Sequence, residues 1–375
     1  MKKFFYLLLN LMVVASFASC IKDEAPNAEC DITGVSFGSS DILNRAPVIS
    51  NDRVLIMVNT NVNITALAPI FTLTPGATIQ PENGTVRNFT TPQEYVVTSE
   101  DGQWHKTYVV DVQRPGSINL KYNFEHVRQV SALSGSASYD VFYEVGSDGK
   151  ESLTWASANA AFALTLQGST PNTFPTYQAI DGERGKCLAL TTRSTGSFGQ
   201  TVKKPLAAGN LFLGEFAMAN ALAKPLEATH FGTTFLSVPF ALSGLYKYFP
   251  GDEYCKMGSD GKLVSVDGVT DKFNIYAVFF EVTADMQWLN GANVLAADNP
   301  NIIAVAEIEN PAPASAWTEF HIPFIFREGK KVDSELLASG RYSISIVMTS
   351  SREGDYFEGA IGSTLFVDDL VLLCE

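Results

Sequence analysis

One short segment combines aromatic rings with acids, and its chemistry is the easiest in the chain to interpret. Residues 245–254 read Leu-Tyr-Lys-Tyr-Phe-Pro-Gly-Asp-Glu-Tyr. Exposed rings stack on the apolar C–H faces of sugars, and nearby polar groups fix the orientation of the hydroxyls. The segment therefore predicts a sugar-binding loop built from Tyr246, Tyr248, Asp252 and Tyr254. The alternative is a strand in which Tyr246 and Tyr248 point to one face and complete a core.

A second candidate is Trp155, because its neighbours Ser152, Thr154, Ser157 and Asn159 are unusually polar for a tryptophan. A ring in such a setting suits a sugar face, and the Asn159 amide suits sugar hydroxyls. The sequence therefore predicts Trp155 as a second platform with Asn159 as its polar clamp.

Three further segments carry side chains of this kind. Trp317 alternates with Glu319 and His321, which indicates a strand and a core position. Trp288 precedes Asn290-Gly291 and has the setting of a loop anchor. The polar run 350–355 places Arg352 either in the same sugar-binding cleft or in a solvated turn.

Catalysis has less support than binding. Glycoside hydrolysis usually needs two carboxylates, about 5–5.5 Å apart for retention or about 6.5–9.5 Å for inversion. The chain has 40 acids, but none stands in a recognisable hydrolase motif, and there is no GxSxG, HExxH or CxxC pattern. The pattern favours binding, and it leaves open a glycoside hydrolase-type enzyme and a structural or adhesive surface protein.

The net charge and the spacing of the cysteines limit which partners and cross-links are expected. The formal charge is −14, and removal of a leader carrying Lys2 and Lys3 would make it −16. An acidic chain with no basic run argues against nucleic acid as a partner. Four cysteines remain besides Cys20, and they are widely spaced, so free thiols and disulfides both stay possible; they are Cys30, Cys187, Cys255 and Cys374.

The chain start has the features of an export signal. Lys2 and Lys3 precede an apolar run that is too short to span a bilayer comfortably, and small residues lead to Cys20. Residues 17–20, Phe-Ala-Ser-Cys, resemble a bacterial lipobox, although an aliphatic residue is usual where Phe17 stands. We expect a signal peptide over 1–19, lipidation of Cys20 and anchoring in the outer-membrane leaflet. The alternative is an ordinary cleaved signal.

A polar tether is expected over residues 20–29. Its Lys22-Asp23-Glu24 cluster resembles the surface-export signal of Bacteroidota lipoproteins, which implies an extracellular orientation. A solvated linker would have a similar composition.

Strand patterns follow, so the fold class is all-β. Runs of Val, Ile, Phe, Tyr and Thr alternate with Gly, Pro, Asn and Asp turns. Residues 54–58 read as a strand, and residues 94–99 and 106–113 as a hairpin around Asp101-Gly102. Residues 30–114 predict an immunoglobulin-like sandwich, which resembles the spacer domains behind lipid anchors in Bacteroidota surface proteins. Pro115-Gly116 marks a boundary, and 117–375 suits a jelly-roll β-sandwich.

The two ends of the larger domain resemble jelly-roll carbohydrate-binding modules. Residues 123–125 read Asn-Phe-Glu, and residues 367–370 read Val-Asp-Asp-Leu. In that architecture the first and last strands lie close together, so Glu125 and Asp368 are candidates for a structural Ca²⁺ site. The alternative is that both acids cap strand ends or pair with Arg and Lys.

A wider resemblance covers the whole domain. Residues 155–159 (WASAN), 208–214 (AGNLFLG), 239–248 (PFALSGLYKY) and 359–365 (GAIGSTL) occur in an order similar to that of the "putative carbohydrate metabolism domain" (PCMD) family of Bacteroidota lipoproteins. The resemblance implies a β-sandwich, a glycan or polysaccharide ligand, and glycan-import proteins as neighbours. It implies no particular reaction.

Overall fold

The computed structural model describes residues 26–39, 41–44, 46–50, 52–59, 62–113, 120–132, 137–146 and 149–374. The predictions for the signal peptide, Cys20, residues 21–25 of the tether and the Pro115-Gly116 boundary lie outside these ranges. The protein is all-β, as predicted: an immunoglobulin-like sandwich is followed by a larger jelly-roll-type sandwich. Within the described residues, no helix has the length and apolar character needed to cross a membrane.

The N-terminal domain is built on a five-stranded sheet of order β2-β3-β7-β6-β5. Its strands are β2 (Val48–Ser50), β3 (Arg53–Met57), β5 (Thr78–Gln80), β6 (Gln93–Thr98) and β7 (His105–Gln113). The strands β1 (Ile32–Ser36) and β4 (Ile70–Leu73) pair separately and cover the core. The predicted hairpin is confirmed as β6 and β7, and the predicted strand at 54–58 is confirmed as β3.

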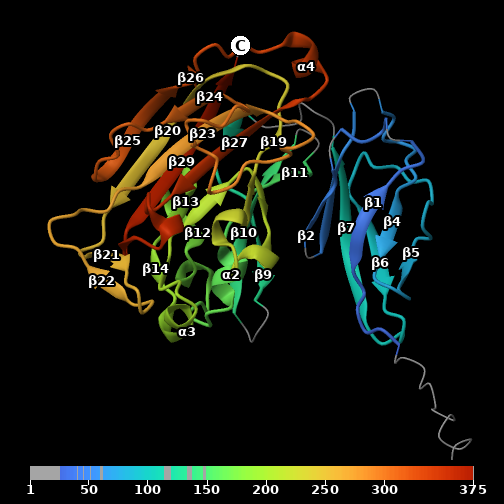
Figure 1. The fold of residues 1–375 in the computed structure, drawn as a ribbon, viewed down its shortest axis with the longest axis horizontal. Coiled ribbons are helices and arrows are strands. Elements are labelled where there is room, and N and C mark those ends of the chain that lie inside the picture. Colours follow the sequence, from blue (N-terminus) through green and yellow to red (C-terminus); the bar gives the residue numbers. More distant parts are fainter. Residues whose placement is uncertain are drawn as a thin grey trace, which may run out of the picture.

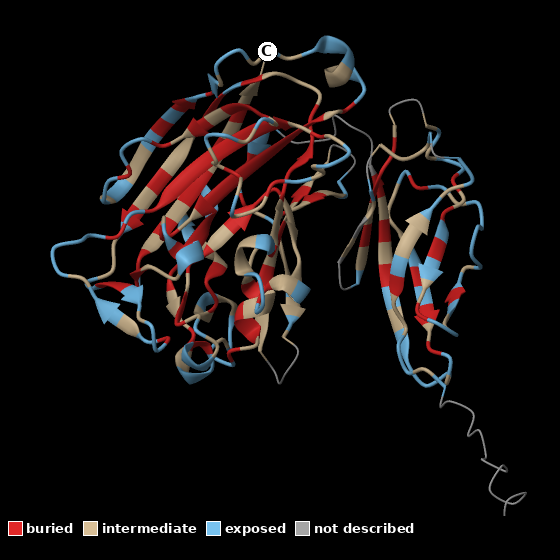
Figure 2. Cartoon of the chain, viewed as in Figure 1, coloured by how far each residue is buried: buried red, intermediate tan, exposed pale blue. Residues whose placement is uncertain are grey.

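Two large sheets form the C-terminal domain, with one main hydrophobic core between them (Figures 1 and 2). The first has the order β12-β13-β29-β20-β25, with β8 also paired to β29; the second has the order β16-β27-β23-β24-β26, with β19 also paired to β27. The strands of the first sheet are β8 (Lys121–Tyr122), β12 (Thr176–Gly182), β13 (Gly185–Thr191), β20 (Pro239–Phe249), β25 (Ala314–Pro323) and β29 (Thr364–Cys374). Those of the second are β16 (Asn210–Phe212), β19 (Thr233–Thr234), β23 (Asn274–Glu281), β24 (Ile302–Glu307), β26 (Ile325–Phe326) and β27 (Tyr342–Thr349).

Smaller elements surround this sandwich and carry most of the loops. The smaller sheets contain β9 (Val127–Ser131), β10 (Ser138–Val145), β11 (Glu151–Thr154), β14 (Arg193–Ser194), β15 (Leu206–Ala207), β17 (Gly214–Phe216), β18 (Thr229–Phe231), β21 (Tyr254–Met257), β22 (Leu263–Ser265) and β28 (Gly359–Ala360). The helical segments that the structure describes are α2 (Asn159–Ala163), α3 (Gly196–Thr201), α4 (Ser334–Ala338), η1 (Pro171–Thr173), η2 (Met218–Asn220), η3 (Pro225–Glu227) and η4 (Gly354–Tyr356).

The two domains stand side by side and are joined by polar contacts (Figure 1). Arg53 of β3 forms a bidentate ion pair with Glu151 of β11, at 2.7 and 3.2 Å, and its guanidinium also donates to the Thr154 hydroxyl. The Asn44 amide donates to the backbone carbonyl of Ser339. The bidentate geometry fixes both distance and angle, so these contacts hold the facing surfaces in register.

Candidate functional site

The predicted sugar platform at residues 245–254 is largely wrong, because its rings are buried. Tyr246 and Tyr248 lie on β20, between β25 and β29, and both rings contact Phe273 at about 4.9 Å between centroids. Tyr248 is 1% exposed, and its hydroxyl donates to the Ser350 carbonyl. Tyr254 is also buried, while Asp252 is exposed. The alternative interpretation is confirmed: Tyr246 and Tyr248 share one strand face and complete the core.

The predicted second platform, Trp155 with Asn159, is buried as well. Trp155 is 2% exposed, and its indole N–H donates to a Glu144 carboxylate oxygen at 3.0 Å. Asn159 is buried and bonds both the N–H and the C=O of Thr176, which ties α2 to β12. The polar neighbours of Trp155 serve the protein's own hydrogen bonds. Trp155 borders the cavity between the two domains, but too little of its ring is exposed to stack on a sugar.

Arg352 also has an internal role. Its guanidinium pairs with Glu307, and its backbone N–H donates to the Lys272 carbonyl. Arg352 is not among the residues that line the two cavities described below. The prediction that Arg352 shares a cleft with the aromatic candidates is therefore wrong.

Glu125 and Asp368 meet at the hairpin between β12 and β13. Glu125 accepts from the Lys186 amide at 3.0 Å, and Asp368 accepts from the Glu183 amide at 2.8 Å. Backbone amides thus donate to the oxygens that a cation would need. This is the arrangement expected if the two acids cap strand ends. Across the described residues, no three His, Cys, Asp or Glu side chains come together as a metal-binding group.

Thermal unfolding decides between a structural Ca²⁺ at Glu125 and Asp368 and the alternative in which both acids only cap backbone amides. Because the amides already occupy these carboxylates, we expect the melting midpoint to be the same in a calcium buffer and in a chelator. A midpoint that falls on chelation and recovers with added Ca²⁺ would instead support the cation.

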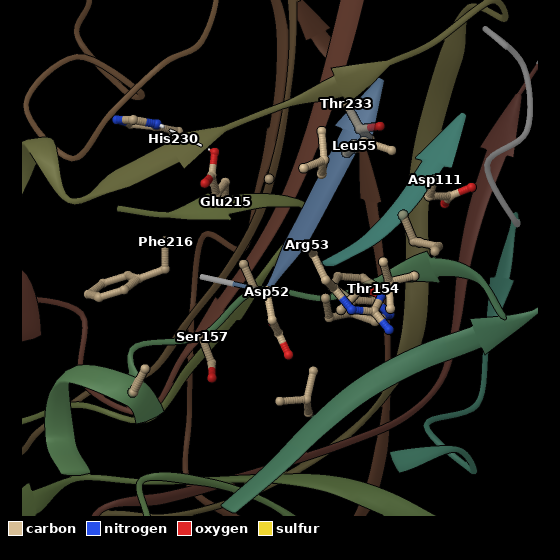
Figure 3. A pocket seen from close by; sticks show the side chains of 18 of the residues that line it. Asp52, Arg53, Leu55, Asp111, Thr154, Ser157, Glu215, Phe216, His230 and Thr233 are labelled. Atoms are coloured by element: carbon tan, nitrogen blue, oxygen red, sulfur yellow. Dashed lines mark hydrogen bonds and ion pairs between the residues drawn. The ribbon is translucent and has the colours of Figure 1, made fainter. Parts of the chain in front are cut away.

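An open cavity lies between the two domains. It encloses about 270 Å³. The N-terminal domain contributes the β2–β3 turn and parts of β3 and β7. The C-terminal domain contributes parts of β9, β10, β11, β17, β18 and β19, the start of α2, and residues 287–288. In Figure 3, Arg53 of one domain lies beside Thr154 of the other, and Asp52 lies near Ser157. We call this cavity the interdomain cleft.

Glu215, His230 and Trp288 form the wall of the interdomain cleft. Glu215 on β17 and His230 on β18 are directly opposed cross-strand partners, with 3.9 Å between carboxylate and imidazole (Figure 3). Backbone hydrogen bonds between Phe231 and Leu289 hold the 282–301 loop against β18. Trp288 therefore stacks on His230, with ring centroids 4.3 Å apart, while 39% of the residue remains exposed.

Two guanidinium groups, those of Arg53 and Arg128, also line the cleft. Arg53 takes both Glu151 oxygens, whereas Arg128 reaches the same carboxylate only at 3.9 Å, and its Nε–H is buried without a hydrogen-bond partner. Burial, followed by the nearby Arg53 charge, lowers the pKa of Arg128. Asp52 and Asp111 also line the cleft, so it carries both donors and acceptors.

The cysteines that the structure describes are free thiols: Cys30, Cys187, Cys255 and Cys374. Burial raises the pKa of Cys187 to about 12, so this thiol stays protonated and behaves as a small apolar group.

Comparisons with known proteins assign both domains. Residues 123–373 match the family described as "Putative carbohydrate metabolism domain" (PCMD), and residues 36–112 match the family described as "SGBP, N-terminal". SGBP stands for surface glycan-binding protein. No curated protein matches the chain.

Two solved structures are similar to this one. The first is described as a "putative glycoside hydrolase" from Bacteroides thetaiotaomicron, with 42% identity, a TM-score of 0.85, and coverage of 94% of this chain and 99% of that one. The second, described in the same words, is from Bacteroides vulgatus, with 43% identity, a TM-score of 0.62, and coverage of 68% and 98%. The chain belongs to the PCMD family and carries an SGBP N-terminal domain in front of its PCMD domain.

Proposed function

We propose that this protein binds a glycan in the interdomain cleft, with Trp288 as the ring on which a sugar stacks. The observation that carries the proposal is the exposed Trp288 indole, stacked on His230 at the edge of a 270 Å³ cavity. His230 supports the indole from behind, so little conformational freedom is lost when a sugar binds. A rigid, half-exposed ring beside polar groups is the combination that sugars require.

The polar groups of the cleft complement the hydroxyls of a sugar. The carboxylates of Glu215 and Asp52 can accept hydrogen bonds from a sugar, and the guanidinium group of Arg128, which also lines the cleft, can donate them. Asp52 lies on the turn between β2 and β3, where its backbone carbonyl accepts from the Val109 amide and fixes the turn. The N-terminal domain, expected from the sequence to be a spacer, is in this proposal one wall of the binding site.

The proposed function also implies a cellular location for the protein. The SGBP match supports a place at the cell surface, and the expected lipidation of Cys20 would hold the protein in the outer-membrane leaflet. A glycan bound there would be passed on to glycan-import proteins. Detection of diacylglycerol on Cys20 by mass spectrometry of the membrane fraction would test the anchor.

Replacing Trp288 by alanine is expected to weaken glycan binding about 30-fold, since anchors of this kind contribute about 2 kcal/mol or more. Calorimetric titration with a panel of polysaccharides and oligosaccharides gives the affinity. Trp104→Ala is the matched control, because Trp104 is 61% exposed on the N-terminal domain and does not line the cleft. Equal affinities for Trp288→Ala and the unmodified chain would contradict the proposal.

Hydrolysis of the bound glycan is a second candidate, favoured by the carboxylates in the cleft and by the description of the two similar structures as glycoside hydrolases. Glu215 is the candidate acid, because it is partly buried beside His230. This alternative predicts release of reducing ends from a polysaccharide, and loss of that release in Glu215→Gln. Binding without release across a broad panel would leave only the first function.

A further inference from the structure

A second cavity lies in the C-terminal domain, directly behind the interdomain cleft. It encloses about 140 Å³. Four phenyl rings line it, together with aliphatic side chains; the apolar side chains that define it are Phe162, Phe198, Leu206, Phe216, Leu222 and Phe357. Phe198 and Leu222 are exposed although they are large and apolar, so the cavity has a mouth at the surface. We call this cavity the phenyl pocket.

Small residues keep the phenyl pocket open. Ala161, Gly199, Ala221 and Ala228 line it where larger side chains would fill it. A Cβ at Gly199 would lie only 1.8 Å from the Thr195 hydroxyl and 2.5 Å from the Lys204 carbonyl, so a larger residue does not fit at this position.

The polar groups of the phenyl pocket are already used by the protein. The Thr165 hydroxyl donates to the Phe162 carbonyl, and the Thr195 hydroxyl donates to the Lys204 carbonyl. The Lys204 ammonium donates to the Val202 carbonyl and lies 5.6 Å from the Phe357 ring. Asp355 also lines the pocket, and burial, followed by the nearby Glu353 charge, raises the pKa of its carboxyl group to about 6. An occupant of the pocket therefore finds apolar surface and few free hydrogen-bonding groups, which suits a hydrocarbon ring.

One side chain and one short helix separate the phenyl pocket from the interdomain cleft. Phe216 lines both cavities, and Figure 3 shows its ring extending from β17 on the side of the cleft where Ser157 lies. On α2 and its N-terminal approach, Ser157 and Ala160 line the cleft, while Ala161 and Phe162 line the phenyl pocket. At Phe216 the two cavities are therefore separated by a single side chain.

We propose that the phenyl pocket binds an aromatic ring carried as a substituent by the glycan that occupies the interdomain cleft. The volume fits one six-membered ring, since an apolar cavity of about 150 Å³ takes up benzene. Four phenyl groups around the pocket offer edge-to-face contacts that an aliphatic chain would not use. The inference rests on the proposed function for its ligand, but the pocket can be tested without any sugar.

Phenol is the probe, measured by saturation-transfer NMR on the purified chain. Seven heavy atoms in an apolar pocket give a Kd of about 1 mM. Ala161→Leu should weaken phenol binding at least about tenfold, because the added carbons occupy the ring's space. Leu222→Asp, at an exposed position that leaves the core intact, should weaken it in the same direction by placing a charge at the mouth.

Trp288→Ala separates this inference from the proposed function. It should weaken glycan binding about 30-fold and leave phenol binding unchanged. No saturation of phenol signals at about ten times the expected Kd, or phenol binding that Trp288→Ala removes and Ala161→Leu does not, would overturn the inference. Phenol binding that responds to Ala161→Leu in a chain that binds no glycan would keep the pocket and reject the proposed function.

Discussion

Replacement of Trp155 by alanine is expected to lower the free energy of unfolding by about 3–5 kcal/mol, the usual cost of removing a large aromatic side chain from a core. Trp155 is 2% exposed and packs edge-to-face on Tyr122, with 5.1 Å between ring centroids, and against Phe124 at 5.9 Å. Its loss also removes the hydrogen bond to Glu144. The variant leaves both a cavity and a buried carboxyl group without its donor.

Urea unfolding followed by far-UV circular dichroism measures this loss, provided that the slope against urea stays constant. Trp288→Ala is the matched control, since it removes the same side chain from a half-exposed position and should cost well under 1 kcal/mol. The pair therefore separates a core tryptophan from a ligand-binding one. Equal losses in the two variants, or a small loss in Trp155→Ala, would contradict the assignment.

Stability should also fall as pH rises through neutrality, because of Glu144. The residue is 4% exposed, and burial raises its pKa from 4.5 to about 7, although the hydrogen bond from Trp155 acts in the opposite direction. In the folded chain the carboxyl group therefore holds its proton at pH values where the unfolded chain has released it. Its stabilising effect is complete below pH 4.5 and is lost as pH rises through 7, by about 3 kcal/mol.

Glu144→Gln isolates this effect, since glutamine keeps an oxygen for the Trp155 N–H and carries no proton to lose. We expect the free energies of unfolding of the two chains to converge near pH 4.5, and the variant to be more stable by about 3 kcal/mol at pH 8. Urea midpoints measured at intervals of pH give both curves. Glu94→Gln, at an exposed carboxylate, controls for the change in net charge. Parallel curves for Glu144→Gln and the unmodified chain would contradict the expectation.

Local patterns were enough to predict the strands but not the surroundings of each side chain. The hairpin at β6 and β7 follows from alternation around an Asp-Gly turn, and such alternation depends only on neighbouring residues. Tyr246 and Tyr248 were predicted in a sugar-binding loop, and the alternative, one shared face of a strand, is correct. Whether that face meets solvent or another sheet depends on Phe273, a distant residue that the local pattern does not identify.

The candidate site was harder to predict, because it is assembled from both domains. Trp155 was predicted as a sugar platform because its neighbours are polar. Two of these neighbours are hydrogen-bonded within the protein: Thr154 to Arg53, and Asn159 to Thr176. Trp288 was read only as a loop anchor, since nothing in its local sequence places it beside His230. Nothing in the sequence around Asp52 marks it as a binding residue, because its proposed role depends on how the two domains face each other.

The central claim is that a glycan occupies the interdomain cleft, and a crystal structure of the complex with an oligosaccharide found by the binding screen tests it most directly. The account predicts a sugar ring stacked on Trp288, with hydroxyl contacts to Glu215 in one domain and to Asp52 in the other. A sugar bound only on the outer face of one domain, with the cleft free of ligand, would contradict it.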